Sequence, residues 1–156
     1  MLLRHRLSGI SFFCMLLPLL QISCYPSNKQ QIKKNNALTF APGWMKGDFE
    51  DDYAIRYTIS DSVWQQLPGS RYVIIRHHLK EQYLVARNDW TKGSGAGLYT
   101  RIDYMKFDNM PPWEWGYCLT VYDAPNDKAA ETAAGADRKN PKKGCNGFPF
   151  SRMKRK

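Results

Sequence analysis

The feature that most constrains the fold of this chain is a series of short segments with alternating apolar residues, separated by clusters of turn-forming residues. Tyr53, Ile55, Tyr57 and Ile59 recur at every second position, which predicts a strand with one buried face. Comparable segments follow at 63–67, 71–79, 83–90, 98–107 and 115–123. Short strands at this spacing predict a mainly β fold, an antiparallel meander that closes into a small barrel, with a β-sandwich as the alternative.

One short helix is expected in the C-terminal part of the chain. Residues 128–134 (KAAETAA) have high helix propensity, N-cap candidates precede them at 123–127, and Gly135 is a natural stop. Strands and helices do not otherwise alternate, so a parallel α/β sheet is not expected. A chain of 156 residues suits one domain, which we place at 47–151, followed by a basic tail at 152–156.

The first 23 residues are expected to be a signal peptide that leaves the mature protein. Arg4 and Arg6 form a positively charged start, and an apolar run follows at 7–20. This run is shorter than the roughly 20 residues that a membrane-spanning helix needs, and it has the length of the apolar region of a secretory signal. No other stretch approaches membrane length, which excludes a protein with several spanning helices.

The end of this signal, residues 20–24 (LQISC), resembles the lipobox of bacterial lipoproteins. The resemblance implies that Cys24 becomes the N-terminus and carries acyl chains such as palmitate, because several chains together anchor a protein firmly. Residues 24–46 are then the lipidated cysteine and a flexible tether. Tyr25, rather than an aspartate, favours the outer membrane of the bacterial cell envelope. The alternatives are ordinary cleavage with Cys24 unmodified, and a retained anchor.

Two of the four cysteines remain available for a disulfide. Cys14 leaves with the signal and Cys24 takes the lipid, so Cys118 and Cys145 form an even pair in an oxidising compartment. Their disulfide would close a loop of about 28 residues, which the loop-entropy model values at about 3 kcal/mol. Two buried free thiols are the alternative. Without a CxxC motif or partnered histidines no metal site is expected, and no cofactor is predicted.

Several phrases of the sequence resemble a known group of proteins. Gly47-Asp48-Phe49, a meander and a helix resemble the calycin or lipocalin-like architecture. More specific phrases resemble small bacterial lipoproteins of unknown function: 88–89 (ND), 98–103 (LYTRID), 117–118 (YC), 122–124 (YDA), 136–137 (AD) and 144–150 (GCNGFPF). The resemblance covers about residues 47–151. It implies a calycin-like barrel, the disulfide and the envelope location, and it leaves the activity open.

Four residues are the candidates for ligand binding: Arg87, Tyr99, Arg101 and Asp103. Tyr99, Arg101 and Asp103 alternate along one strand, so their side chains should share a face. If that face points into the barrel, the buried charges need partners, and an Arg–Asp network there would hold the polar end of a ligand. The alternative is a structural ion pair at one end of the barrel.

Aromatic side chains make up 13% of the chain, and they either line an apolar cavity or fill the barrel. The candidates for the lining are Trp64, Trp90, Trp113, Trp115, Tyr117 and Phe107. 

Two further groups of residues are candidates for chemical sites. The acidic run 48–52 has oxygen ligands suited to Ca²⁺, but such runs are usually solvated. His77 and His78 are adjacent on a predicted strand and therefore point to opposite faces. Neither group makes a convincing catalytic set, so an enzyme is not expected.

The function predicted from the sequence is a binding module for a small apolar or amphipathic ligand, held at the envelope by its lipid anchor. The alternative is a surface interaction or envelope-structural protein with a filled core. The formal net charge of +9 and the basic C-terminus suggest an anionic envelope component as a further partner. Nucleic acid is not expected, because an exported protein would rarely meet it.

Overall fold

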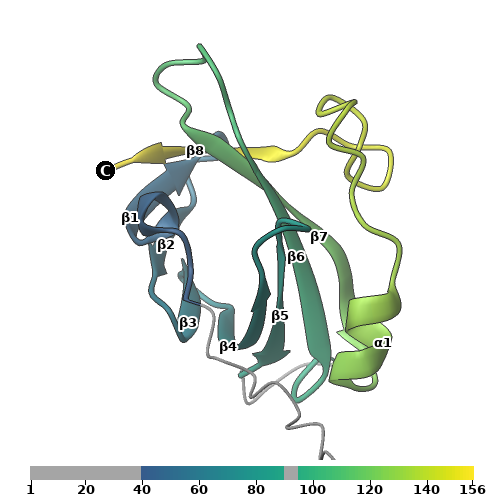
Figure 1. The fold of residues 1–156 in the computed structure, drawn as a ribbon. Helices are drawn as coiled ribbons and strands as arrows, with labels where there is room; N and C mark the ends of the chain where they lie inside the picture. The colour runs from purple at the N-terminus through teal and green to yellow at the C-terminus, as the bar shows by residue number, and fades with distance from the viewer. Residues whose placement is uncertain (1–39, 90–94) are drawn as a thin grey trace, which may run out of the picture. The chain divides into compact units, whose positions relative to one another are not determined.

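The computed structural model describes residues 40–89 and 95–156, which form a closed antiparallel barrel of eight strands (Figure 1). Each strand pairs with its neighbours in sequence, and the first strand closes the barrel against the last. The predicted mainly β fold and small barrel are thus confirmed, in a form compatible with a calycin-like architecture. The strands are β1 Gly47–Asp51, β2 Arg56–Ile59, β3 Val63–Leu67, β4 Arg71–His78, β5 Tyr83–Asn88, β6 Tyr99–Lys106, β7 Trp115–Ala124 and β8 Ser151–Arg155.

The β1–β2 turn begins where we predicted a strand. Tyr53 is 69% exposed, and Ala54 has a positive φ of 60°. The cause lies in Asp51, whose carboxylate Oδ1 accepts the backbone N–H groups of Tyr53 and Ile55, both at 2.9 Å. An aspartate that binds the backbone N–H two residues ahead favours a turn over a strand. The alternating segment therefore becomes a strand only from Arg56.

The acidic run 48–52, a candidate calcium loop, lies mostly in strand β1 instead. Its side chains point alternately to the two faces and find separate partners: Asp48 accepts from Thr58, Glu50 pairs with Lys154, and Asp51 is buried. The described part of the chain contains no group of three residues that could hold a metal ion.

Both ends of the barrel domain differ from the predicted boundaries. The expected basic tail at 152–156 contains most of β8, in which Met153 is fully buried and the backbone pairs with β1 and β7. The expected tether includes the short 3-10 helix η1 (Gly43–Met45), whose Met45 is also fully buried. Arg155 joins the two ends, because its guanidinium lies over the Phe49 ring and donates to the backbone carbonyls of Trp44 in η1 and of Lys46 just after it.

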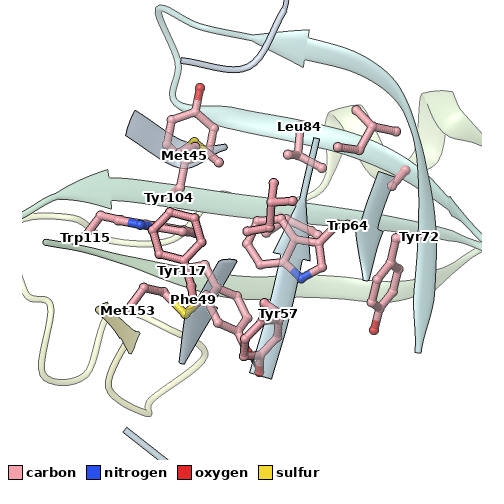
Figure 2. Close-up of a cluster of buried hydrophobic side chains, with 14 residues drawn as sticks. Met45, Phe49, Tyr57, Trp64, Tyr72, Leu84, Tyr104, Trp115, Tyr117 and Met153 are labelled. Carbon is pink, nitrogen blue, oxygen red and sulfur yellow. Dashed lines mark hydrogen bonds between the residues drawn. The ribbon is translucent and has the colours of Figure 1, made fainter. Parts of the chain in front are cut away.

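Aromatic rings occupy the middle of the barrel interior (Figure 2). Trp64 contacts Tyr57, Trp115 and Tyr117 edge to face, with ring centroids 5.0 to 6.1 Å apart. Phe49 contacts Trp115 in the same way at 5.3 Å. Of the six aromatic residues considered for a cavity lining, Trp64, Trp115 and Tyr117 belong to this cluster, whereas Trp113 and Phe107 do not. Trp90 lies outside the described residues.

A helix covers part of the outer surface of the barrel. Helix α1 (Asp127–Thr132) packs on β5, β6 and β7, and its Ala130 is buried in one cluster with Tyr83, Val85 and Ala124. Asn126 caps it by accepting the N–H of Ala129 at 2.8 Å. The helix is shorter than predicted because Ala133 is already extended. Within the described residues, no helix has the length and apolar character needed to cross a bilayer.

Candidate functional site

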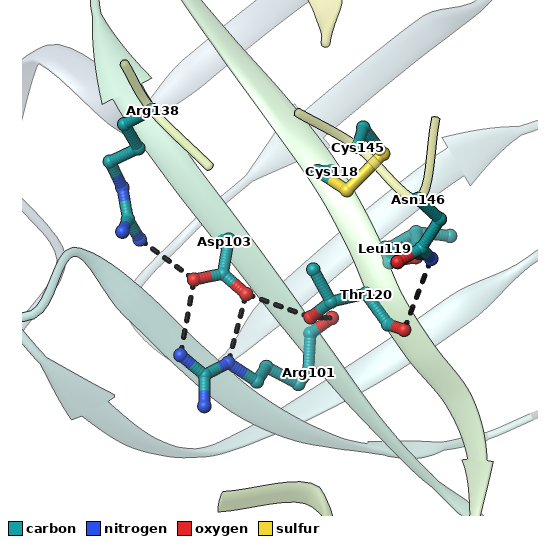
Figure 3. The surroundings of a disulfide bond; sticks show 8 residues. All are labelled: Arg101, Asp103, Cys118, Leu119, Thr120, Arg138, Cys145 and Asn146. Atoms are coloured by element: carbon teal, nitrogen blue, oxygen red, sulfur yellow. Dashed lines mark hydrogen bonds and ion pairs between the residues drawn. A yellow bond between two sulfur atoms is a disulfide. The ribbon is translucent and has the colours of Figure 1, made fainter. Parts of the chain in front are cut away.

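The predicted pair Arg101 and Asp103 forms an ion-pair network on the outer face of the barrel (Figure 3). Asp103 is fully buried, and its carboxylate accepts from Arg101 Nε at 2.8 Å, Thr120 Oγ1 at 2.7 Å and Arg138 Nη2 at 2.7 Å. Ile102 and Tyr104, which alternate with the pair, face the interior cluster instead. The inward orientation that would let Arg101 and Asp103 hold a ligand inside the barrel is therefore absent.

The remaining contacts of Arg101 fasten the end of α1 to the barrel. Its Nη1 donates to the carbonyl oxygens of Glu131 and Ala133, both at 2.9 Å, and its guanidinium lies 3.8 Å from the Tyr83 ring centroid. Gly135 covers the pair so closely that a Cβ there would lie 2.7 Å from Arg101 Nη2. These contacts favour the structural ion pair, because groups of the protein itself already occupy the positions around Arg101 where a ligand would have to bind.

The other predicted ligand residues do not join this network. Tyr99 packs in the apolar layer beneath α1, and Arg87 lies exposed on the outer face. The two histidines point to opposite sides, as the alternation predicts: His77 Nε2 lies 3.1 Å from the carbonyl of Asp61, and His78 stacks on Tyr83 beside Glu131. Cys24, the predicted lipidation site, lies outside the described residues.

The predicted disulfide between Cys118 and Cys145 is confirmed (Figure 3). It joins β7 to the segment that leads from α1 to β8. Phe150 packs beside it and is 2% exposed, in a small outer cluster with Ala136 and Met105. Gly144 makes this segment compact, because any Cβ there would lie 1.9 Å from the carbonyl oxygen of Asp137. The disulfide thus holds a folded loop against the outer face of the barrel.

An apolar groove of about 490 Å³ lies between this loop, the β1–β2 turn and the β6–β7 loop. Tyr53, Phe107, Met110 and Phe150 provide apolar surface in it. Tyr53 and Met110 are 69% and 39% exposed. Large apolar side chains that lie together and remain exposed commonly mark binding surfaces. Gly116 admits the Phe107 ring onto β7, because a Cβ there would lie 2.7 Å from Phe107 Cζ. The volume falls within the range of small-molecule sites.

Arg152 supplies a positioned cation in this groove. Its Nε donates to Asp52 Oδ2 at 2.9 Å, its backbone N–H donates to Asp52 Oδ1 at 3.1 Å, and its guanidinium carbon lies 5.0 Å from the Trp113 ring centroid. Among the described residues, its Nη1 and Nη2 have no acceptor. Lys142 also lines the groove, is exposed, and forms no ion pair within the same described ranges. The groove therefore combines apolar walls with two basic groups.

A chain of hydroxyl groups fixes one side of the interior. Tyr57 donates to Asp51 Oδ2 at 2.8 Å, and the Tyr57 and Tyr117 hydroxyl oxygens are 2.7 Å apart. Burial raises the pKa of Tyr57 far above its ordinary value, with the neighbouring Tyr117 adding to the rise. Burial raises the pKa of Tyr117 to about 12 as well. Both phenols are therefore protonated, neutral hydrogen-bonding groups at physiological pH.

Sequence reasoning missed the groove and the role of Arg138. Arg138 lies in a loop, and nothing in the local pattern connects it to Asp103 on β6, 35 positions away. Asp52 and Arg152 are 100 positions apart, although the alternation around Met153 could have indicated that Arg152 lies on the outer face of a strand. Comparison with known protein families, curated proteins and solved structures found no match.

Proposed function

We propose that this protein is an exported, lipid-anchored protein of the bacterial cell envelope that binds a small amphipathic ligand in its outer groove. The observation that carries the binding function is the groove itself, where exposed apolar side chains surround a positioned arginine. The sequence predicts a small apolar or amphipathic ligand inside the barrel. We now propose the amphipathic class, and we propose its site on the outer face instead of in the interior. The aromatic cluster supports this change because it fills the middle of the interior.

Two features of the chain support the envelope location. Residues 20–24 resemble a lipobox after a short apolar run, and the disulfide is typical of proteins that fold in oxidising compartments. In this proposal Cys24 carries the lipid, and the residues before η1 tether the barrel to the membrane.

The first experiment is native mass spectrometry of residues 25–156, exported without the lipidated cysteine. A stoichiometric extra mass that is lost on denaturation would show a retained ligand and its size. Binding of the neutral dye N-phenyl-1-naphthylamine then locates the site. We expect Met110→Asp to weaken dye binding, because it places a charge among the apolar walls.

The matched control is Leu79→Asp, which changes a similarly exposed residue in the β4–β5 turn, outside the groove. It should leave dye binding unchanged. Equal dye binding by both variants would contradict a site in the groove.

The second candidate function is a surface interaction or envelope-structural role. The aromatic cluster in the barrel interior and the basic outer face of β8, with Arg152 and Lys154 over Trp113, favour it. A protein of this kind would show a bare mass and no dye binding, while retaining affinity for an anionic envelope component. We propose no catalytic role, because the two histidines point to opposite sides of the strand and do not converge on one site.

A further inference from the structure

The charges in the groove specify the kind of amphipathic ligand that it fits, an inference that rests on the proposed function. We propose that the groove binds a single-chain amphiphile with a monocarboxylate head, a fatty-acid-like molecule, with its head at Arg152 and Lys142. Its chain then lies along Tyr53, Phe107 and Met110.

The first argument is the geometry of Arg152. A guanidinium recognises a carboxylate best when its planar edge is held in advance, because less side-chain freedom is then lost on binding. Asp52 holds the Nε side of this guanidinium, and the Trp113 ring supports its plane. The two terminal nitrogens are left without acceptors in the described part of the chain, and they form the edge that a carboxylate would bind.

The second argument is the balance of charge. Asp52 is 13% exposed at its side chain and compensates the charge of Arg152, so Lys142 supplies the one uncompensated charge among the groove residues. A single negative charge on the ligand restores neutrality. A phosphate monoester carries nearly two charges at neutral pH, and its second charge would lie close to the Asp52 carboxylate.

The third argument is the apolar surface on the other walls. Tyr53 and Met110 expose large apolar side chains to solvent, and a bound alkyl chain would remove this surface from water. The lining contains Met110, a flexible side chain that adapts to ligands of irregular shape. An alkyl chain with a carboxylate at one end therefore matches both parts of the groove.

The test measures displacement of N-phenyl-1-naphthylamine by sub-micellar dodecanoate and dodecanol, which have chains of the same length. Residues 25–156 serve for this purpose, because they contain the complete described barrel with its closed ladder and its own core. We expect dodecanoate to bind about tenfold more tightly than dodecanol, as one charge-assisted hydrogen bond would give. Added salt should reduce this preference, because the partners are partly exposed.

Two variants locate the head group. Lys142→Gln should lower the preference for dodecanoate without affecting folding, since Lys142 is exposed and forms no ion pair among the described residues. Arg152→Gln should abolish the preference, provided that its circular dichroism matches the wild type. Lys128→Gln is the control, because it removes the same charge from α1, where the side chain is 76% exposed. It should leave the preference unchanged.

The outcomes separate this inference from the proposed function. Dye binding with equal displacement by dodecanoate and dodecanol would overturn the carboxylate assignment and leave the binding module intact. Tighter binding of dodecyl phosphate than of dodecanoate would also overturn the assignment. A preference that persists in both the Lys142 and Arg152 variants would place the head group elsewhere and overturn the proposed site. Absence of any dye or amphiphile binding would overturn both proposals.

Discussion

Arg101 is the residue whose substitution best distinguishes a structural role from a ligand-binding role. Arg101→Ala removes four hydrogen bonds and leaves the fully buried Asp103 with Arg138 and Thr120 alone. Leaving a buried charge wholly unpaired costs about 3 to 5 kcal/mol, and because Arg138 still pairs with Asp103 the cost here should lie at the lower end, about 3 kcal/mol. We expect a loss of this size in the free energy of unfolding, measured by urea denaturation with far-ultraviolet circular dichroism.

Arg71→Ala is the matched control for this prediction. Arg71 pairs with Asp89 at the surface, where both side chains are about half exposed. An exposed pair of this kind contributes less than about 1 kcal/mol. If Arg101→Ala unfolds at the wild-type urea concentration but no longer retains a ligand, the ion-pair network is a binding site rather than a structural element.

Two interior tyrosines should differ in how much stability the protein loses when their hydroxyl groups are removed. Tyr57→Phe removes the donor to Asp51 Oδ2 and the contact with Tyr117, at a cost of about 1 to 3 kcal/mol. The Tyr104 hydroxyl is buried and has no hydrogen-bond partner among the described residues. Tyr104→Phe should therefore leave the free energy of unfolding unchanged or raise it. Thermal unfolding of the two variants tests this contrast, and an equal loss in both would contradict it.

At the scale of elements, the disulfide loop connects stability with the groove. Replacing Cys118 and Cys145 by alanine opens a loop with a sequence separation of 27, which should lower the free energy of unfolding by about 3 kcal/mol. The loop also forms one wall of the groove, through Phe150 and its neighbours. The variant should therefore bind N-phenyl-1-naphthylamine more weakly than the wild type under conditions where both are folded.

Reduction of the wild-type protein is the control for that substitution. It breaks the same connection without changing the side chains around Phe150. Weak dye binding by the alanine variant, with full binding by the reduced wild type, would assign the effect to packing at the substituted positions. Full dye binding in both would show that the wall keeps its place without the disulfide.

The strands that could be predicted are those whose alternation is strong and local. The segment 63–67 has the bounds of β3, and β4 to β7 lie within one or two residues of the predicted ranges. β8 escaped prediction because Met153 is its only apolar residue between basic ones. Its strand conformation depends on backbone pairing with β1 and β7, which no local pattern reveals.

The candidate site was predictable only in part, for a related reason. Alternation correctly placed Arg101 and Asp103 on one face of a strand, but it cannot tell which face a later helix will cover. The groove is harder still, because its walls come from three connections that are distant in sequence. Loops carry no periodic pattern, so their meeting is visible only in the folded barrel.

At the scale of the whole molecule, the buried tyrosines predict sensitivity to alkaline pH. Burial raises the pKa of Tyr104 and Tyr117 from an ordinary value of 10.0 to about 12. The unfolded chain therefore loses these protons first as pH rises, so the native state binds more protons in this window. The contribution of these two phenols to the free energy of unfolding should be fully present below pH 10 and should be lost as the pH rises from 10 to about 12.

Ionisation and unfolding should coincide in this pH range. Phenolate absorbance and near-ultraviolet circular dichroism, followed through one titration, test the prediction. Tyr104→Phe removes one of the shifted groups and should reduce the loss of stability over this range. A rise in phenolate absorbance of all the tyrosines near pH 10 while the barrel stays folded would contradict it, because the buried phenols would then keep their ordinary pKa.

The attachment of the whole protein to a membrane depends, in our proposal, on one sulfur atom. Cys24→Ala removes the atom that accepts the lipid, so the chain should lose palmitate labelling and leave the membrane fraction. Each buried methylene of an acyl chain contributes about 0.8 kcal/mol, so losing all the chains should release the protein completely.

Cys14→Ala is the matched control, because Cys14 lies within the apolar run and its substitution should leave labelling unchanged. A Cys24→Ala chain that stays in the membrane would indicate a retained anchor at 7–20. A soluble wild-type chain with unmodified Cys24 would indicate ordinary secretion. Either result would leave the barrel and its groove intact while removing the membrane from the protein's proposed function.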